Sequence, residues 1–478
     1  MPRAEVVICG AGIAGIAAAY HLAVKQGLRD VVLVEQGDPL SLTSDKSTEA
    51  YRNWWPVKGH RPPARAGTQV KGHRPPARAG TQGPDPAMIE LMNRSIELLE
   101  EIARHTDNRI QLNRRGYLYA TAEKDKISTL QQSAENAERM GAGPLRTHDG
   151  LSNHYLPSAA HGLDGADLLT DRAAIRSSFP YLSPDTVAVL HVRKAGWFSA
   201  QQLGMWMLEQ ARAHGAGLIR GKVVGVDTAG GKVASVQIEQ DGSSRTLETP
   251  VLVNAAGPMQ KEVAAMLGVD LPVFAELHRK MSFPERLGVV PREAPMLIWT
   301  DDLELPWSEE ERQVLAEDES TRWLLGKFPS GVHCRPDGHG ESTTLIVLFN
   351  YHTGPVPPVF PLPPDPHYAD VALRGVSVMV PGLRQYWGKA PKPWIDGGYY
   401  VKTRENRPLI GPLPVGGAYI LGALSGFGVM AACAAGELLA AHLLGNALPG
   451  YAPAFSLSRY ENPEYREWLE GAGDGAQL

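Results

Sequence analysis

The sequence has few cysteines, little excess charge and almost no long apolar runs. Its 478 residues include three cysteines, Cys9, Cys334 and Cys433, which lie so far apart that they indicate neither a metal-ligand spacing nor a disulfide framework. We therefore expect no bound metal and a reducing, cytoplasmic compartment. The formal net charge is −5, which gives no reason to expect a nucleic-acid partner.

One apolar run, residues 6–23, could pass for a signal peptide or a membrane-spanning segment. Gly10, Gly12 and Gly15 interrupt this run, and neither a basic stretch nor a small-residue cleavage site flanks it. A buried strand followed by a helix explains the run better. No other stretch is expected to be long and apolar enough to cross a bilayer, so we predict no membrane span.

The remaining composition is that of an ordinary globular protein, with 43% hydrophobic and 21% charged residues. A chain of this length is expected to fold into two or three domains. Residues 57–69 repeat unchanged as residues 70–82, and together they hold two Pro-Pro pairs, six basic residues and no acidic residue. The segment could be a basic tether or docking arm. Because so few apolar side chains cannot offset the entropy of ordering, we predict a disordered insertion over 57–82.

A glycine-rich turn near the N-terminus carries the clearest motif. Residues 5–9 form a short apolar run, residues 10–15 follow the pattern Gly-x-Gly-x-x-Gly, and a helical stretch leads to a second apolar run at 31–34. This βαβ spacing is typical of a dinucleotide site, where the glycines allow a tight turn, admit a pyrophosphate and let the helix pack on the strand. An acid after the second strand can bind the ribose hydroxyls. The predicted cofactor contacts here are Gly10, Ala11, Gly12, Ile13, Ala14, Gly15, Glu35 and Gln36.

A second glycine-rich turn lies near the other end of the chain. Residues 422–428 separate a strand-like run from an apolar helix over about 429–444. Backbone N–H groups at such a helix start suit the pyrimidine edge of a reduced, anionic flavin, although a plain strand-to-helix connection is the alternative. The turn favours FAD over NAD. Its candidate contacts are Gly426, Phe427, Gly428, Val429 and Met430.

Several stretches together resemble the D-amino-acid oxidase-like superfamily of flavoproteins, in the branch of glycine oxidase, sarcosine oxidase and dimethylglycine dehydrogenase. Besides the two glycine turns, these stretches are residues 44–52, the Val-Asn-Ala-Ala-Gly-Pro sequence at 253–258, and residues 397–412. They occur in the family's order from residue 4 to about residue 445. The resemblance adds further predicted FAD contacts, namely Ser44, Ser47, Thr48, Val223, Ala256 and Gly257.

The resemblance implies an α/β fold, with α+β character in a second domain. A Rossmann-type FAD-binding domain would be joined to a substrate domain built on a large antiparallel sheet, with the flavin at their interface. The expected boundaries are 1–56, 160–265 and 396–450 for the FAD-binding domain, 83–159 and 266–395 for the substrate domain, and 451–478 for a C-terminal tail.

The sequence departs from these relatives at positions that matter for the cofactor and the substrate. Some relatives bind FAD covalently through a cysteine where this chain has Gly398, so we expect non-covalent FAD. Met430 stands where sarcosine oxidases have a lysine that helps to hold the substrate carboxylate, and a thioether cannot pair with a carboxylate. Arg52 remains as a candidate carboxylate anchor, with a salt bridge or a flavin contact as the alternative. The substrate could instead be an amine without a carboxylate, or a bulkier amino acid.

The stretch Tyr351-His352-Thr353 resembles a strand end near the flavin in sarcosine oxidases. His352 is a candidate base or substrate contact, with Tyr351 beside it, and a purely structural role is the alternative. Four residues before His352, Leu348 stands where sarcosine oxidases have a lysine that speeds the reaction with oxygen. We therefore expect a slow reaction with oxygen, because a leucine cannot stabilise a forming anion. The alternative is that Lys402 or Lys280 reaches the flavin from another strand.

These observations predict an FAD-dependent oxidoreductase that oxidises the CH–NH bond of an amine or amino acid by hydride transfer to flavin N5, giving an imine that hydrolyses. Besides this small-molecule substrate, an electron-acceptor protein or a second copy of the chain could be a partner. An NAD-dependent dehydrogenase is a second interpretation, but it leaves the turn at 422–430 unexplained. A non-catalytic or partner-dependent flavoprotein subunit of a dehydrogenase complex is a third.

Overall fold

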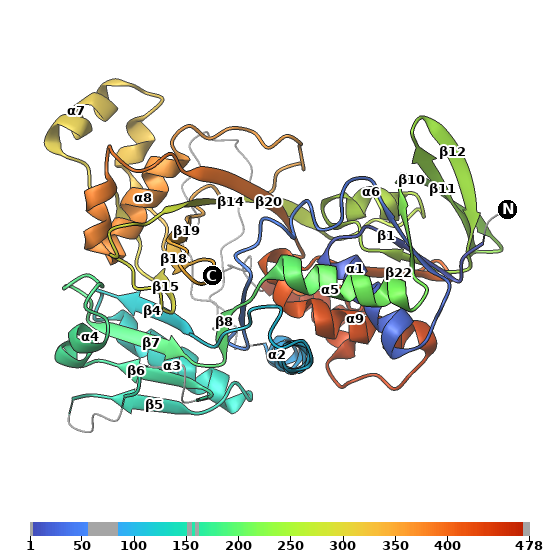
Figure 1. Cartoon of the computed structure of the whole chain (residues 1–478), viewed down its shortest axis with the longest axis horizontal. Coiled ribbons are helices and arrows are strands. Elements are labelled where there is room, and N and C mark those ends of the chain that lie inside the picture. Colours follow the sequence, from blue (N-terminus) through green and yellow to red (C-terminus); the bar gives the residue numbers. More distant parts are fainter. Residues whose placement is uncertain (1–2, 56–84, 151–154, 158–161, 472–478) are drawn as a thin grey trace.

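The computed structural model describes residues 3–55, 85–150, 155–157 and 162–471. The predicted insertion over 57–82 and residues 472–478 of the predicted tail lie outside this part of the chain. Figure 1 shows two halves: β4 to β7 with α3, α4, α7 and α8 form one, and α1, α5, α9, β1 and β22 form the other. The strand β8 and the helix α2 lie between them (Figure 1).

A six-stranded sheet organises the half that contains the N-terminal glycine motif. Its order is β21 (Leu409–Pro412), β22 (Ala418–Gly422), β13 (Leu252–Asn254), β1 (Val6–Cys9), β2 (Val31–Glu35) and β9 (Gly217–Arg220). All neighbours are parallel except β21 and β22. The inner strands are buried apolar runs, as is typical of parallel strands covered on both faces.

Four helices build the apolar core beside this sheet. They are α1 (Ile13–Tyr20), α2 (Pro86–His105), α5 (Ala200–Ala213) and α9 (Gly428–Leu444). The helix α1 packs against α5 and α9, and α2 packs against α9. Gly436 of α9 allows this close approach, because a Cβ there would lie 2.8 Å from the Ala17 carbonyl oxygen of α1.

One helical stretch corrects an expectation from the sequence. Ser425–Leu444 is long and apolar enough to cross a membrane by length and composition, whereas we expected no such stretch beyond the N-terminal run. The 18-residue window that meets these criteria is 67% buried inside the protein. Its side chains pack in the core between α1 and α2. A core helix meets the same length and composition criteria, so this stretch is weak evidence for a membrane span.

A nine-stranded sheet organises the other half. Its order is β20 (Trp394–Lys402), β14 (Phe274–Pro284), β19 (Thr344–Leu348), β18 (His333–Pro336), β15 (Met296–Trp299), β4 (Tyr117–Thr121), β7 (Ala188–Val192), β6 (Ala166–Leu169) and β5 (Leu145–His148). Most neighbours are antiparallel, while β15–β4 and β5–β6 are parallel. Large sheets of both kinds are therefore present, which confirms the predicted fold class.

The two faces of the nine-stranded sheet have different roles, because side chains alternate along each strand. One face carries Met281, Val347, Cys334 and Leu297, which pack in an apolar core with α8 (Tyr368–Met379). The opposite face, which we call the inner face, carries Lys280, Leu348, His333, Ile298 and Tyr119, which pair in register across five strands. The inner face is the one that meets the loop between β2 and β3, as described below.

Smaller elements complete the fold. A three-stranded sheet consists of β10 (Lys222–Ala229), β11 (Lys232–Gln240) and β12 (Ser243–Glu248), and two-stranded pairs are formed by β3 (Ala50–Arg52) with β8 (Ala195–Trp197) and by β16 (Leu303–Glu304) with β17 (Lys327–Phe328). The other α-helices are α3 (Lys126–Arg139), α4 (Arg172–Ser178), α6 (Gln260–Ala265), α7 (Glu309–Glu317) and α10 (Pro463–Gly471).

Two expected domain boundaries differ from the sheets. We assigned residues 160–265 and 396–450 to the cofactor-binding domain. The strands β6 and β7, however, belong to the nine-stranded sheet, and so does β20, most of which lies within residues 396–450. These strands are short apolar runs, and such a run does not reveal which of two sheets it joins.

Candidate active site

A first cavity opens at the carboxyl ends of β1, β2 and β13. Glu35 is fixed at its wall, since one carboxylate oxygen accepts the Ala11 N–H at 2.8 Å and the other accepts the Gly37 N–H at 2.9 Å. A carboxylate held in this way is suited to bind the hydroxyls of a ribose. Gly10, Gly12, Gln36, Val223, Ala256 and Gly257 also line this cavity.

A second cavity adjoins the first, since Gly12, Ser44 and Gly257 line both. It extends from the start of α1, through Ile13 and Ala14, to the start of α9, where its wall includes Gly426, Gly428 and Val429. Two helix N-termini therefore face one space, and their partial positive charge favours anionic groups. Ser47, Tyr399 and Tyr400 form another part of its wall.

The two cavities fit FAD as a ligand. The first offers a ribose-binding carboxylate, the boundary between them offers a glycine turn for a pyrophosphate, and the second offers apolar walls and a helix N-terminus for a flavin. Glu35 and Gln36 would hold the adenosine end. Gly426, Gly428 and Val429 would lie at the flavin end.

Five predicted cofactor contacts line neither of these two cavities within the described residues, and they support the walls instead. The Ala11 N–H binds Glu35, and a Cβ at Gly15 would lie 2.0 Å from the Gly10 carbonyl oxygen. Phe427 packs against Trp55. The Thr48 and Met430 carbonyls accept hydrogen bonds from Arg335 and Ser95.

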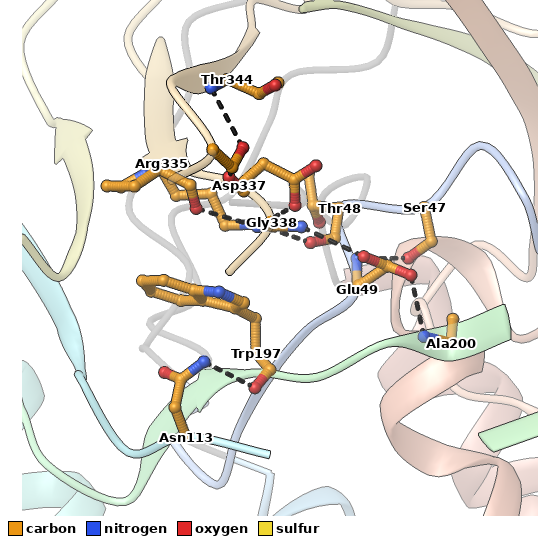
Figure 2. A network of polar contacts seen from close by, with 12 residues as sticks. Ser47, Thr48, Glu49, Asn113, Trp197, Ala200, Arg335, Asp337, Gly338 and Thr344 are labelled. Atoms are coloured by element: carbon orange, nitrogen blue, oxygen red, sulfur yellow. Dashed lines mark hydrogen bonds and ion pairs between the residues drawn. The ribbon is translucent and has the colours of Figure 1, made fainter. Parts of the chain in front are cut away.

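The loop of residues 43–49, which we call the cofactor loop, is bound to the nine-stranded sheet. Arg335 of β18 is fully buried, and its Nε donates to the Thr48 carbonyl oxygen at 2.8 Å while Nη2 lies 3.3 Å from Glu49 Oε2 (Figure 2). Its guanidinium stacks over the Trp197 ring of β8, with 5.2 Å to the centroid. Lys280 of β14 donates to the Ser47 carbonyl oxygen at 3.0 Å. The inner face of the sheet therefore supports a wall of the second cavity.

Arg52 lies at the end of β3 and is 9% exposed. Its Nε donates to the Trp54 carbonyl oxygen at 3.1 Å, and its guanidinium lies over the rings of Trp55 and Tyr117. Burial lowers the pKa of Arg52, but the phenols of Tyr119 and Tyr117 outweigh this and raise it. A buried, permanently charged guanidinium next to the inner face suits a ligand carboxylate, so its role as anchor stays a prediction with structural support.

Tyr351 and His352 lie away from both cavities. Tyr351 follows the end of β19 and packs in the apolar core on the other face of the sheet, where its hydroxyl donates to Asp365 at 2.8 Å. The His352 side chain is 62% exposed. The geometry therefore does not bring either side chain to the inner face, and their catalytic role stays a prediction without structural support.

Tyr400 and Arg335 are residues at the site that the sequence did not reveal, and Lys280 was considered only as a lysine that could reach the flavin. Tyr400 lines the second cavity and stacks on His278, with ring centroids 4.0 Å apart. Its position in the 397–412 motif was a signal that could have found it. Lys280 and Arg335 lie on strands with no local motif, so only the strand register places them.

Gly398 packs against the cofactor loop, where a Cβ would lie 3.2 Å from the Thr43 Cα. All three cysteines are buried, and Cys9 lines the first cavity. Burial raises the pKa of the Cys9 thiol to about 12, so it is not a reactive thiolate. Non-covalent FAD stays a prediction, which release of flavin into the supernatant on acid precipitation would check.

The fold and the lining of the two cavities define a dinucleotide-binding oxidoreductase. The chain belongs to the family of FAD-dependent oxidoreductases described as DAO, whose family model matches residues 5–442. Its cofactor is FAD, as the two glycine turns and the family resemblance predicted.

Sequence and structure comparisons agree with this assignment. Mitochondrial dimethylglycine dehydrogenase of Rattus norvegicus is 25% identical over 308 residues, which are 62% of this chain but only 28% of that relative. The L-proline dehydrogenase of P. horikoshii has a TM-score of 0.69 at 19% identity and glycine oxidase of Geobacillus kaustophilus 0.68 at 16%, each covering 96% of this chain and 99% of the other. These structural matches show that the fold is shared.

Proposed function

We propose that this chain oxidises the carbon–nitrogen bond of a small amino acid. The observation that carries the proposal is the buried guanidinium of Arg52 beside the inner face of the sheet that supports the cofactor loop. The similar proteins, which include a proline dehydrogenase, a glycine oxidase and a dimethylglycine dehydrogenase, support the same substrate class.

Each part of the site has a role in this reaction. FAD, when bound, supplies the hydride acceptor at its N5 atom. Arg52 holds the substrate carboxylate and so directs the Cα–H bond toward the flavin, an orientation effect of the kind that positions reactants for hydride transfer. The apolar walls exclude water from the reacting carbon until the imine has formed.

We further propose that the natural electron acceptor is something other than oxygen. Leu348 is buried on the inner face between Lys280 and His333, and the ammonium of Lys280 is already bound by the Ser47 carbonyl oxygen. A non-catalytic flavoprotein subunit is not favoured, because the similar proteins are named as oxidases, dehydrogenases and deaminases.

Anaerobic reduction of the flavin tests the proposed function. Purified protein is titrated with amino acids and amines without oxygen, and the loss of the visible absorbance of the oxidised flavin is followed. At least one small amino acid should bleach the flavin, and the matching amine without a carboxylate should do so poorly. Bleaching by no amino acid would refute the proposal.

Arg52→Met should keep flavin but need on the order of 100-fold more amino acid for half-maximal reduction, because a charge-assisted pair with the carboxylate is lost. Arg104→Met is the matched control, since Arg104 is exposed on α2. It should behave as the unchanged protein. Equal behaviour of the two variants would remove Arg52 from the substrate site.

A further inference from the structure

A row of side chains crosses the inner face of the nine-stranded sheet. Its members are direct partners on neighbouring strands, so they point to the same side. In order they are Lys280, Leu348, His333, Ile298 and Tyr119. Lys280, at one end, binds the cofactor loop through the Ser47 carbonyl oxygen. Tyr119, at the other end, lies beside Arg52. His333 is thus between the cofactor loop and the candidate carboxylate anchor.

The hydrogen bonding of His333 fixes its tautomer. Its Nδ1 lies 2.8 Å from the Gly331 carbonyl oxygen, and since a carbonyl can only accept, Nδ1 must carry the proton. Within the described residues, no hydrogen-bond partner reaches Nε2, which therefore presents a lone pair. Burial lowers the pKa of His333 to about 4, and the positive charge of Arg52 acts in the same direction. The ring is neutral at physiological pH.

Tyr119 provides a second polar group without a protein partner. Its hydroxyl is buried and has no hydrogen-bond partner among the described residues. A buried hydroxyl left unsatisfied costs roughly 1–3 kcal/mol, which a bound ligand oxygen would recover. Tyr119 is two strands from His333, a backbone separation of about 10 Å, and Ile298 of β15 stands between them in the same row.

We propose that His333 Nε2 accepts a hydrogen bond from the N–H of the substrate amine, while Arg52 and the Tyr119 hydroxyl hold the carboxylate. The inference rests on the proposed function and names the group that selects the amine. A hydride leaves the α-carbon only when the nitrogen lone pair is available, so the reacting amine is uncharged. A neutral acceptor can bind that form, and the nearby positive charge of Arg52 disfavours an ammonium group.

The assignment defines a substrate class. A primary or secondary α-amino acid keeps an N–H in its uncharged form and satisfies His333. An uncharged tertiary amine has none and would leave Nε2 facing an alkyl group. The site should therefore prefer amino acids with an N–H over N,N-dialkyl amino acids, because a site built for a polar contact rejects a ligand that lacks it.

Two ligands that cannot be oxidised at a C–H next to an amine test this assignment directly. Pyrrole-2-carboxylate and furan-2-carboxylate share a five-membered ring and a carboxylate, but only the first has an N–H. Binding to the flavin-loaded protein is followed by the change in flavin absorbance. The unchanged protein should bind the pyrrole compound at least about 10-fold more tightly, as expected for one hydrogen bond to a half-buried acceptor.

His333→Leu should reduce this preference to less than about 3-fold and leave the affinity for furan-2-carboxylate within about 3-fold, since only the acceptor is removed. His333→Gln keeps an acceptor oxygen and should retain more of the preference than the leucine variant. Tyr119→Phe and Arg52→Met should weaken both ligands in proportion. His339→Leu is the matched control, because His339 is exposed in the turn after β18, and it should change neither affinity.

The flavin spectrum of each variant reports whether its fold is intact, and His333→Phe replaces His333→Leu if the leucine variant does not hold flavin. The proposal is overturned if the unchanged protein shows no preference, if it binds neither ligand, or if the preference survives in the leucine or phenylalanine variant. None of these measurements needs turnover. Failure here therefore leaves the anaerobic reduction screen to decide the proposed function by itself.

Discussion

At the residue scale, the three glycines of the N-terminal motif have separable roles. A Cβ at Gly15 would lie 2.0 Å from the Gly10 carbonyl oxygen, whereas a Cβ at Gly12 meets only the Ser44 hydroxyl at 3.3 Å. Gly12 lines both cavities. We therefore expect Gly12→Val to lose FAD while the apoprotein stays folded, and Gly15→Val to lose the fold itself.

Far-ultraviolet circular dichroism and thermal unfolding of the flavin-free proteins distinguish these outcomes. Gly12→Val should unfold within a few degrees of the unchanged apoprotein, and Gly15→Val should be destabilised by several kcal/mol, roughly the upper range for overpacking. If Gly12→Val still bound FAD, the pyrophosphate would not pass Gly12, and the assignment of the boundary between the two cavities would be wrong.

Most of the predicted cofactor contacts that line the two cavities belong to contiguous turns, which a sequence motif can locate. Gly10 to Gly15 and Gly426 to Val429 are short segments whose backbone itself forms the cavity wall. Tyr351 and His352 were assigned from a three-residue match, and such a match does not reveal the face of a strand. His333 has no motif around it. Its position depends on pairing with Leu348 and Ile298, which are far from each other in sequence.

At the element scale, β14 and β20 are joined by a buried ionic cluster behind the cavity wall. Lys402 Nζ lies 2.7 Å and His278 Nε2 3.1 Å from Glu276 Oε2, and the His278 ring stacks on Tyr400. Burial raises the pKa of Glu276, but hydrogen bonds from His278 and Lys402 overcome this and lower it to about 2. The cluster thus stabilises the wall only while Glu276 is ionised.

Glu276→Gln should destabilise the protein at pH 7 by about 3 kcal/mol, because a buried ammonium loses its counter-ion. Since the folded-state pKa of Glu276 is lower than its unfolded value, its contribution is complete above about pH 4.5 and is lost as pH falls toward 2. Urea unfolding at pH 7 and at pH 3 should therefore show a smaller gap between the two proteins at pH 3. A gap that does not depend on pH would mean that Glu276 is not ionised in the folded state.

At the scale of the whole molecule, the order of the sheets could not be read from the sequence. The runs Ala166–Leu169 and Ala188–Val192 resemble strands of either sheet, and only their pairing with β4 and with each other assigns them to the nine-stranded sheet. The βαβ unit at the N-terminus was predictable because its strands are close in sequence. Long-range pairing was not, because it depends on contacts between distant segments.

Arg335 connects the two halves of the molecule. Its side chain has 0% exposure. Its guanidinium binds the Thr48 carbonyl oxygen, Glu49 and Asp337, and it stacks on Trp197. We expect Arg335→Met to weaken FAD binding on the order of 100-fold, because Glu49 loses a buried partner and the cofactor loop loses its support from β18. Quenching of FAD fluorescence by the apoprotein measures this affinity.

Arg335→Lys separates charge from geometry in the same connection. A lysine keeps the positive charge but cannot bind Thr48, Glu49 and Asp337 through one planar fork or stack in the same way on Trp197, so it should recover only a small part of the affinity. Arg245→Met is the matched control, since Arg245 is exposed on β12, and it should bind FAD as the unchanged protein does. Full recovery in Arg335→Lys would show that charge alone holds the loop. Unchanged affinity in Arg335→Met would show that the cofactor loop keeps its shape without the nine-stranded sheet, and the two halves would then be coupled by the flavin rather than by Arg335.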